Sequence, residues 1–245
     1  MIPKRAFPLV LMALLAGTAH AQISVNRSVI EFTDQGRIQD IEVLNTGRNK
    51  VYLDLSVAEI VDPESDEPRR VEFDDPRSAP VLVSPRQLLV PPRTRKRVRV
   101  IMREGAPRSD RIFRLAVTPY TGKARIAPQE GVEKSSAVRV LVAYDLLLIA
   151  RPSELRPAVA VKRDDRSIVF RNEGNTNVLL RRIVQCEDGV DPDAPQADKS
   201  CVEIPANRLY AGETYRVSLP KKGSAERYPV KVWESVGFTN TTRSF

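Results

Sequence analysis

The segment from Ala137 to Ile149, AVRVLVAYDLLLI, constrains the fold of this protein more than any other. Its first half alternates, with Val138, Val140 and Val142 on one face, as in a strand that is covered on one side. Its second half, Leu146–Ile149, is apolar at every position and is followed by an Arg-Pro pair. A strand of this length spans about 43 Å, more than twice the usual value. Either a second sheet of the same protein buries all of it, or part of it is offered to another protein.

The first 21 residues have the composition of a secretory signal. Lys4 and Arg5 form a basic start, Phe7–Gly17 is an apolar core too short to span a bilayer, and Ala19–Ala21 is a small-x-small cleavage site. We therefore expect cleavage after Ala21 and export to the periplasm, rather than the alternative of a buried N-terminal helix. No later segment reaches the roughly 18 apolar residues that a membrane span needs, so no membrane insertion is expected.

Removal of the signal also removes His20, the only histidine of the sequence. Without histidine, a Ser-His or Cys-His nucleophile and imidazole ligands for zinc are excluded. Carboxylates remain in the stretch Val61–Pro76, but they lie among turn residues with no sign of an apolar pocket. The sequence therefore predicts a protein that is not an enzyme and that uses no metal or other cofactor.

Cys186 and Cys201 are the only cysteines. In an exported protein a lone pair predicts a disulfide, which would stabilise the fold by about 3 kcal/mol through loop closure. A metal site would need further ligands that the sequence does not place nearby. The acidic, proline-containing stretch between the two cysteines is then expected to be tied to a sheet.

Short β-type runs recur between Pro, Asp, Asn and Gly at spacings near ten residues, which is typical of β-sandwiches rather than βαβ units. No run in the mature protein has convincing helical periodicity. The predicted strands are Arg37–Leu44, Val51–Ile60, Val81–Val83, Arg97–Met102, Ile112–Pro119, Val138–Ile149, Ser167–Arg171, Val178–Val184, Thr214–Leu219 and Tyr228–Trp233.

An internal repeat favours two all-β domains over one. The pattern N-x-G-x-x-x-V-x-L begins at Asn45 and again at Asn172, each time between two apolar strands. Such a pattern fits a turn in which glycine tolerates a positive φ. We place the boundary in Arg151–Pro157, which gives an N-terminal domain over residues 22–151 and a C-terminal domain over residues 152–245.

The mature protein is basic, because the loss of Lys4 and Arg5 leaves 37 basic residues against 31 acidic ones. The basic residues cluster in Arg93–Arg103, where arginines alternate with valines. Nucleic-acid binding would favour aromatic residues among the charges, and the cluster has none, so no nucleic-acid partner is expected. A solvated strand face is the favoured interpretation, and an acidic protein partner is the alternative.

Several of these features together resemble the periplasmic chaperones of the chaperone–usher pathway of pilus assembly. The resemblance covers most of the mature sequence, and its second domain resembles that of the non-classical (archaic or alternative) branch. It rests on Ile23–Arg27, Ser84-Pro85, Leu88–Pro91, Val98–Val100, Ile112–Arg114 with Pro119, the long strand with Arg151-Pro152, and Arg171–Leu180 with Cys186.

The resemblance implies two immunoglobulin-like β-sandwich domains in an L-shaped arrangement. It also implies that Val138, Val140 and Val142 enter the groove of an incomplete pilus subunit, while Leu146–Ile149 remain in the core of the chaperone. Such strand addition combines backbone hydrogen bonds with pockets for alternate side chains. The implied partners are pilus subunits and an outer-membrane usher. Self-association of the free protein through its exposed strand is left open.

One feature departs from the pattern of the family. The classical members hold the carboxylate at the C-terminus of the subunit with an Arg on the first strand and a Lys on the long strand. The matching positions here carry Val29 and Leu147. A buried carboxylate still needs a cation, and the candidate replacements are Arg114, then Arg27, then Arg151.

A secreted structural or adhesive immunoglobulin-like protein, such as a pilus subunit or tip component, is the alternative. Pilus subunits tend to be single incomplete domains with an N-terminal donor extension, whereas two domains fill this sequence.

Overall fold

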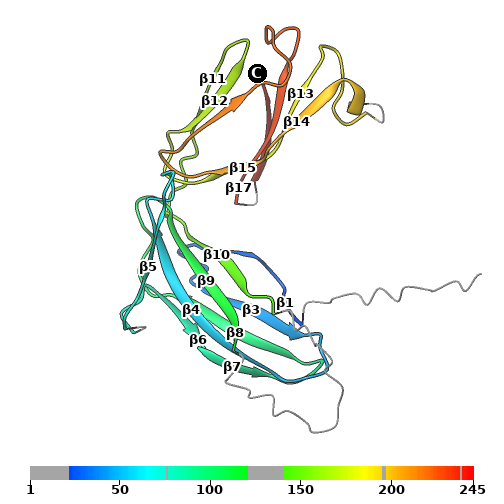
Figure 1. Ribbon diagram of the computed structural model, residues 1–245. Helices are drawn as coiled ribbons and strands as arrows, with labels where there is room; N and C mark the ends of the chain where they lie inside the picture. Colours follow the sequence, from blue (N-terminus) through cyan, green and yellow to red (C-terminus); the bar gives the residue numbers. More distant parts are fainter. Residues whose placement is uncertain (1–21, 76, 121–140, 195–196, 238) are drawn as a thin grey trace, which may run out of the picture.

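The computed structural model describes residues 22–75, 77–120, 141–194, 197–237 and 239–245. These residues form an all-β protein of two sandwiches, which meet at an angle (Figure 1). The only helical element among them is a short 3-10 turn, η1 (Ala197–Lys199). No helix in the described ranges is long and apolar enough to cross a membrane. The predicted fold class is confirmed.

The first sandwich packs a four-stranded sheet on a six-stranded one. The smaller sheet has the order β1-β3-β8-β6, and the larger has the order β2-β10-β9-β4-β5, with β7 also paired to β4. All neighbours are antiparallel except β2 and β10, which run parallel. The strands are β1 (Ile23–Val25), β2 (Val29–Phe32), β3 (Ile38–Asn45), β4 (Val51–Val61), β5 (Arg69–Glu72), β6 (Val81–Ser84), β7 (Gln87–Val90), β8 (Arg95–Met102), β9 (Arg111–Tyr120) and β10 (Tyr144–Ala150).

The second sandwich has a sheet of order β11-β12-β16 and a sheet of order β14-β13-β17-β18, with β15 paired to β13. In Figure 1 β15 and the nearby end of β17 lie toward the first sandwich. The strands are β11 (Val159–Arg163), β12 (Ser167–Asn172), β13 (Val178–Cys186), β14 (Cys201–Ile204), β15 (Asn207–Leu209), β16 (Thr214–Ser218), β17 (Val230–Val236) and β18 (Thr239–Ser244).

Each sandwich has its own hydrophobic core, because inward positions of both its sheets are apolar. The first core includes Phe32, Phe113 and Leu148, all nearly inaccessible to solvent, and the second is centred on Phe170, Leu180 and Val232. The backbone passes between them in the segment that follows β10, where the domain boundary is predicted. That each half folds by itself stays a prediction.

Of the long strand predicted over Val138–Ile149, the structure describes residues 141–149. β10 begins at Tyr144 and ends at Ala150, and Leu141 to Ala143 are described but form no strand. The reason is pairing: the ladder between β10 and β9 stops at Tyr144 and Val117, and β2 reaches only Leu147–Ala150. Residues 121–140, and with them Val138 and Val140, lie outside the described part of the protein.

The repeated N-x-G pattern encodes the same buried corner twice. The side-chain amide of Asn45 donates to the carbonyls of Asn49 and Val90, and that of Asn172 donates to the carbonyls of Thr176 and Leu209. In both corners the asparagine side-chain oxygen accepts the N–H of the glycine two residues later, at 2.9 Å. Both asparagines are fully buried. The repeat is therefore structural and fixes the same corner in each sandwich.

The predicted disulfide joins Cys186 at the end of β13 to Cys201 at the start of β14. The two residues are cross-strand partners, so the bridge closes the base of the loop that contains η1.

The basic cluster is a solvated strand face, as the favoured interpretation has it. On β8, Val98 and Val100 are buried, whereas Arg97 and Arg99 are exposed. The guanidinium of Arg99 lies 3.0 Å from the carboxylate of Asp40 on the neighbouring strand. Part of this positive charge is thus neutralised within the sheet.

The corner at Asn172 yields a stability prediction. Replacement of Asn172 by Ala removes one acceptor and two donors, and leaves buried backbone groups of Gly174, Thr176 and Leu209 without those partners. Each unsatisfied buried group costs about 1 to 3 kcal/mol. We expect Asn172→Ala to lower the free energy of unfolding by about 3 kcal/mol or more, measured by urea denaturation.

The exposed Asn240 on β18 has no side-chain hydrogen bond among those found and serves as the control. Asn240→Ala should change stability by no more than about 0.5 kcal/mol. Equal effects of the two substitutions would contradict the role given to the corner.

Candidate functional site

The backbone pairing of β10 changes at Leu147. From Leu147 to Ala150 the strand is paired on both sides, by β2 and by β9. Before Leu147, β9 is its only partner among the described strands, so within the described part of the protein the backbone edge that faces away from β9 is open there. An open strand edge presents unpaired N–H and C=O groups and can pair with a strand of another protein.

The side chains of β10 follow the same division. Leu146, Leu147, Leu148 and Ile149 are all buried, which agrees with the prediction that this run remains in the protein's own core. Val142 is half-buried, and Leu141 and Ala143 are exposed. Tyr144 points inward, and its hydroxyl donates to the carbonyl of Ile23 on β1 at 2.7 Å.

Leu147 lies in one row with two other positions of interest. Val29 on β2 is its partner on one side, and Arg114 on β9 is its partner on the other. The two positions where the family resemblance implies a cation, Val29 and Leu147, are thus neighbours, and both are apolar. Arg114 is the cation next to them.

Arg114 is accessible and only loosely held. Its side chain is 34% exposed, its Nε lies 3.9 Å from a carboxylate oxygen of Asp145, and its Nη1 is 3.5 Å from the Asp145 carbonyl. Asp145 has a closer partner in Arg70, at 3.2 Å. The guanidinium of Arg114 therefore keeps donors that can reach a further anion.

Arg27 is exposed and lies just before β2, and its Nη1 donates to the side-chain oxygen of Gln39 at 3.5 Å. The next residue, Ser28, accepts the N–H of Leu147 through its carbonyl. Arg27 is thus close to the point where the open edge of β10 begins.

Arg151 has a different environment from the other two candidates. Its side chain is only 2% exposed, and its Nη2 lies 2.7 Å from Glu31 on β2 while its Nη1 lies 3.2 Å from Asp110. Nη1 also donates to the Thr176 hydroxyl and to the carbonyl of Asn177, both in the second sandwich. These partners belong to the protein itself, so Arg151 connects the two sandwiches and is not an accessible anchor.

Asp110 is the centre of this connection. Its carboxylate accepts hydrogen bonds from the backbone N–H and side-chain amide of Asn177 and from the Thr176 hydroxyl. Burial raises the pKa of Asp110 above its usual value, although the charge of Arg151 and the bonds from Asn177 act in the opposite direction. Asp110 and Arg151 therefore form a desolvated ion pair in which each charge depends on the other.

An apolar contact across the same junction involves Tyr210, which directly follows β15. It packs against the cluster of Ile112, Leu147 and Ile149 on the outer face of the first sandwich. Burial raises the pKa of Tyr210, and the nearby positive charges of Arg208 and Arg114 lower it in part. Tyr210 thus brings the second sandwich next to the Leu147 row.

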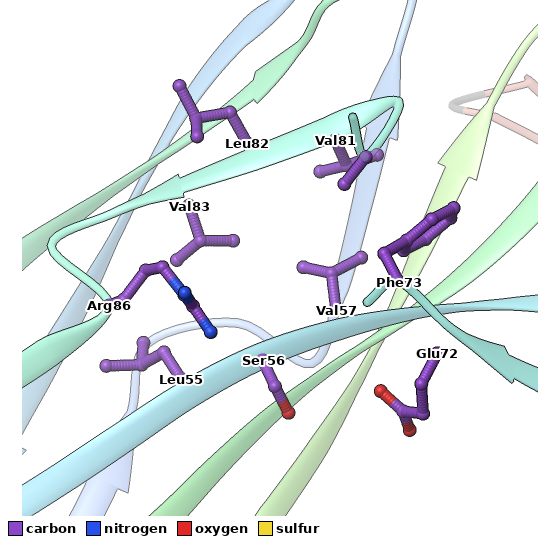
Figure 2. A pocket seen from close by; sticks show the side chains of 10 residues that line it. Leu55, Ser56, Val57, Glu72, Phe73, Val81, Leu82, Val83 and Arg86 are labelled. Atoms are coloured by element: carbon purple, nitrogen blue, oxygen red, sulfur yellow. The ribbon is translucent and has the colours of Figure 1, made fainter. Parts of the chain in front are cut away.

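A small cavity opens between β4 and β6 of the first sandwich (Figure 2). Its volume is about 50 Å³, and the side chains of Val57, Phe73, Val81 and Val83 line it. In Figure 2 Ser56 and Glu72 extend on the opposite side of β4 from Val57. Arg86 also lines the cavity and lies on the same side of β4 as Val83, so of these three polar side chains only that of Arg86 is on the cavity side.

The sequence reasoning missed Asp110, Glu31, Asn177 and Tyr210 as residues of the junction. Asn177 belongs to the repeated N-x-G segment and lies directly before β13, so the repeat could have indicated that it is a structural residue. The other three lie far from Arg151 in the sequence, and no spacing rule connects them to it.

No protein-family model and no curated protein matches the sequence. Solved structures do match. The class 5 fimbriae chaperone CfaA is 15% identical, and the match spans 91% of this chain and 98% of that chain with a TM-score of 0.62. The CupB2 chaperone of Pseudomonas aeruginosa is 13% identical, and the match spans 90% of this chain and 98% of that chain with a TM-score of 0.57.

A third match comes from the CsuC–CsuE chaperone–tip adhesion subunit pre-assembly complex of Acinetobacter baumannii, described as part of an archaic chaperone–usher system. It is 12% identical, and the match spans 82% of this chain and 92% of that chain with a TM-score of 0.53. At such identities the likeness shows the fold, which is the two-domain immunoglobulin-like fold of these chaperones.

The junction yields a second prediction. Asp110→Ala leaves the buried Arg151 with one carboxylate partner and removes the acceptor of Asn177 and Thr176. Breaking a buried ion pair costs about 3 to 5 kcal/mol. We expect a loss of that size in chemical denaturation, together with a broader distribution of shapes in small-angle X-ray scattering, because the contact joins the two sandwiches.

Asp188, which is exposed and forms no ion pair among those found, is the matched control. Asp188→Ala should leave both measurements unchanged. If Asp110→Ala behaved like Asp188→Ala, the network would not hold the sandwiches together.

Proposed function

We propose that this protein is a periplasmic chaperone of pilus subunits and not an enzyme. The observation that carries the proposal is the edge of β10, which is paired on both sides after Leu147 and open before it. A fold similar to that of fimbrial chaperones supports it, as do the alternating valines that precede the described part of β10. The non-classical branch of these chaperones stays a prediction.

The open edge would bind a subunit whose own sandwich lacks a strand. Backbone hydrogen bonds along residues 141–146 and the segment before them would supply affinity, and Val138, Val140 and Val142 would fill the groove of the subunit. Covering the groove and the exposed edge of the subunit prevents its aggregation. Leu146 and Leu148 would keep their places in the core of the chaperone.

The chaperone needs a cation for the carboxylate at the end of the client polypeptide, since an unpaired buried carboxylate is costly. Arg114 is the first choice, because it lies beside Leu147 and its side chain is 34% exposed. Arg27 is the second choice. Arg151 is not retained, because its donors serve Glu31, Asp110 and the second sandwich.

Delivery completes the proposed role. The chaperone, exported by the signal over residues 1–21, would pass its client to an outer-membrane usher. Release would follow when a strand of the neighbouring subunit replaces the donated one, which needs no nucleotide or metal. In the absence of a client, the open edge of one copy is available to another copy, and self-association of the free protein is left open.

A structural or adhesive immunoglobulin-like protein is the other candidate. Such a protein would polymerise or remain on the outer surface, whereas a chaperone would be monomeric or bound one-to-one to a client. Size-exclusion chromatography of the periplasmic fraction separates these outcomes.

The donated strand is tested with two substitutions to Asp at neighbouring positions, whose side chains point to opposite faces of the strand. Val140→Asp places a charge in the face that enters the client, and Leu141→Asp places one in the opposite, exposed face. We expect C-terminally tagged wild type and Leu141→Asp to capture small secreted β-sandwich subunits from the native periplasm. Val140→Asp should lose them at least tenfold while its thermal unfolding stays unchanged.

Equal capture by Val140→Asp and the wild type would disprove donation by this face. If a folded wild-type protein captured no β-sandwich subunit at all, the structural or adhesive candidate would replace the chaperone.

A further inference from the structure

A group of basic side chains occupies one end of the first sandwich. β4 begins at this end, which lies away from the second sandwich (Figure 1). Two turns meet there, residues 46–50 between β3 and β4 and residues 91–94 between β7 and β8. Asn45 joins the turns, because its N–H donates to the carbonyl of Thr94 and its side-chain amide donates to that of Asn49. The basic tip, as we call this group, consists of Arg48, Lys50, Arg93, Arg95 and Lys96.

Most of the charge on the basic tip is not neutralised within the protein. All five residues are exposed, and only Arg95 forms an ion pair among the described residues, at 3.2 Å from Glu42. The other four donate no hydrogen bond to a described residue, so their charged groups keep donors for a further partner. Farther along β8, Arg99 lies 3.0 Å from Asp40 on β3. The end of the sandwich therefore keeps a positive charge that is neutralised in part farther along the same strand.

Arg93 stands at a strained position of the second turn. Its φ is 55°, in the left-handed region that glycine adopts more readily than a residue with a Cβ. Residues held in this region cost free energy in the fold, and they cluster at functional sites. Arg93→Gly would relieve the strain but would also remove one charge from the basic tip. Stability and a binding role therefore make opposite demands at this position.

An apolar row lies beside the basic tip, on the outer face of the larger sheet. It consists of Leu89 on β7, Tyr52 on β4 and Tyr120 on β9, which are directly paired neighbours. Their exposed fractions are 44%, 46% and 67%. The ammonium of Lys50 lies 5.7 Å from the centre of the Tyr52 ring, so the apolar row and the basic tip are continuous. The next row of the same face carries the exposed Asp54, so this apolar surface is confined to the end of the sandwich.

The two groups together have the chemistry of a surface that lies on an anionic membrane. Lysine and arginine are attracted to the headgroups of anionic lipids, and the attraction grows with the number of cations. Tyrosine is enriched at the boundary between water and the bilayer, and exposed leucine can enter the same layer. Charge spread over two exposed turns fits an extended anionic surface better than a single carboxylate, which is held by donors fixed in one geometry.

We propose that the basic tip and the apolar row bind the surface of a membrane that contains anionic lipids. The cations lie against the headgroup phosphates, and the side chains of the apolar row enter the interface beside them. The contact is peripheral and involves the bilayer surface only. It leaves the open edge of β10 free, because β9 and β4 separate β10 from β7 in the sheet. Membrane binding therefore goes beyond the proposed function and does not require a client.

The test uses the mature protein and sucrose-loaded vesicles that can be sedimented. One set of vesicles is phosphatidylcholine alone, and the other is an equimolar mixture of phosphatidylcholine and phosphatidylglycerol. We expect the protein to sediment with the mixed vesicles at low salt and to stay in solution with the neutral ones. Added sodium chloride should release it, because salt screens the attraction between exposed charges.

Arg48→Gln combined with Lys50→Gln removes two cations of the basic tip. A basic residue near an anionic surface strengthens binding about fivefold, so this double variant should bind the mixed vesicles about twentyfold more weakly. The matched control is Lys162→Gln combined with Arg216→Gln, which removes two exposed cations of the second sandwich that have no ion pair among the described residues. The control should bind within about twofold of the wild type, because salt screens charges that lie away from the membrane.

Two single variants separate charge, apolar contact and strain. Arg93→Gly should weaken binding to the mixed vesicles about fivefold, while its unfolding temperature should not fall below that of the wild type. Tyr120→Ser should weaken binding but keep the salt dependence of the wild type, since it removes apolar contact and no charge. A lower unfolding temperature with unchanged vesicle binding would assign Arg93 to the fold and not to the membrane surface.

Equal losses in the two double variants would show a general effect of net charge and would overturn the proposed surface. If the folded wild type did not sediment with the mixed vesicles at low salt, membrane binding would be overturned, and an acidic protein would be the remaining partner for the basic tip. Because no client is present in these assays, either result would leave capture by the Val140 face to be judged separately.

Discussion

The buried guanidinium of Arg151 is the constraint on which the relation between the two sandwiches depends. A charge taken out of water is tolerated only where partners surround it. Arg151 follows β10 directly, and its partners come from β2, from the residue before β9 and from the turn before β13. These four places must therefore converge, and their convergence sets β15 and Tyr210 against the Leu147 row.

Much of the fold could be predicted from the sequence, because its elements are specified locally. Each of the ten predicted strands has a counterpart, and the disulfide was readable from residue type and spacing. The N-x-G repeat was predicted as a turn with glycine at a positive φ, but neither Gly47 nor Gly174 has one, and the buried asparagines that fix each corner were not predicted. Strands such as β5 and β18 were missed because their residues are exposed and polar, so no alternation marks them. They form because the backbone of a neighbouring strand supplies hydrogen-bond partners, which is a tertiary effect.

The candidate site was less predictable for the same reason. Alternation in residues 137–149 indicated a strand but not where its pairing begins, which depends on how far β2 and β9 extend. Arg151 was proposed as an anchor, since an arginine next to a functional strand looks available in the sequence. Its burial depends on Asp110 and Glu31, which approach it only in the fold.

Leu147 divides β10 into two parts with different requirements. After it, backbone groups have partners on both sides, so apolar side chains on both faces can be buried without leaving polar groups unpaired. Before it, the three valines Val138, Val140 and Val142 are identical, so a shift of the client strand by two residues preserves their pattern. Another feature must therefore fix the register between this segment and a client strand. A fixed stop at Leu147 with cations beside it would remove that ambiguity. The register of the complex would then be set by charge at one end of the client strand, and the valines would contribute affinity.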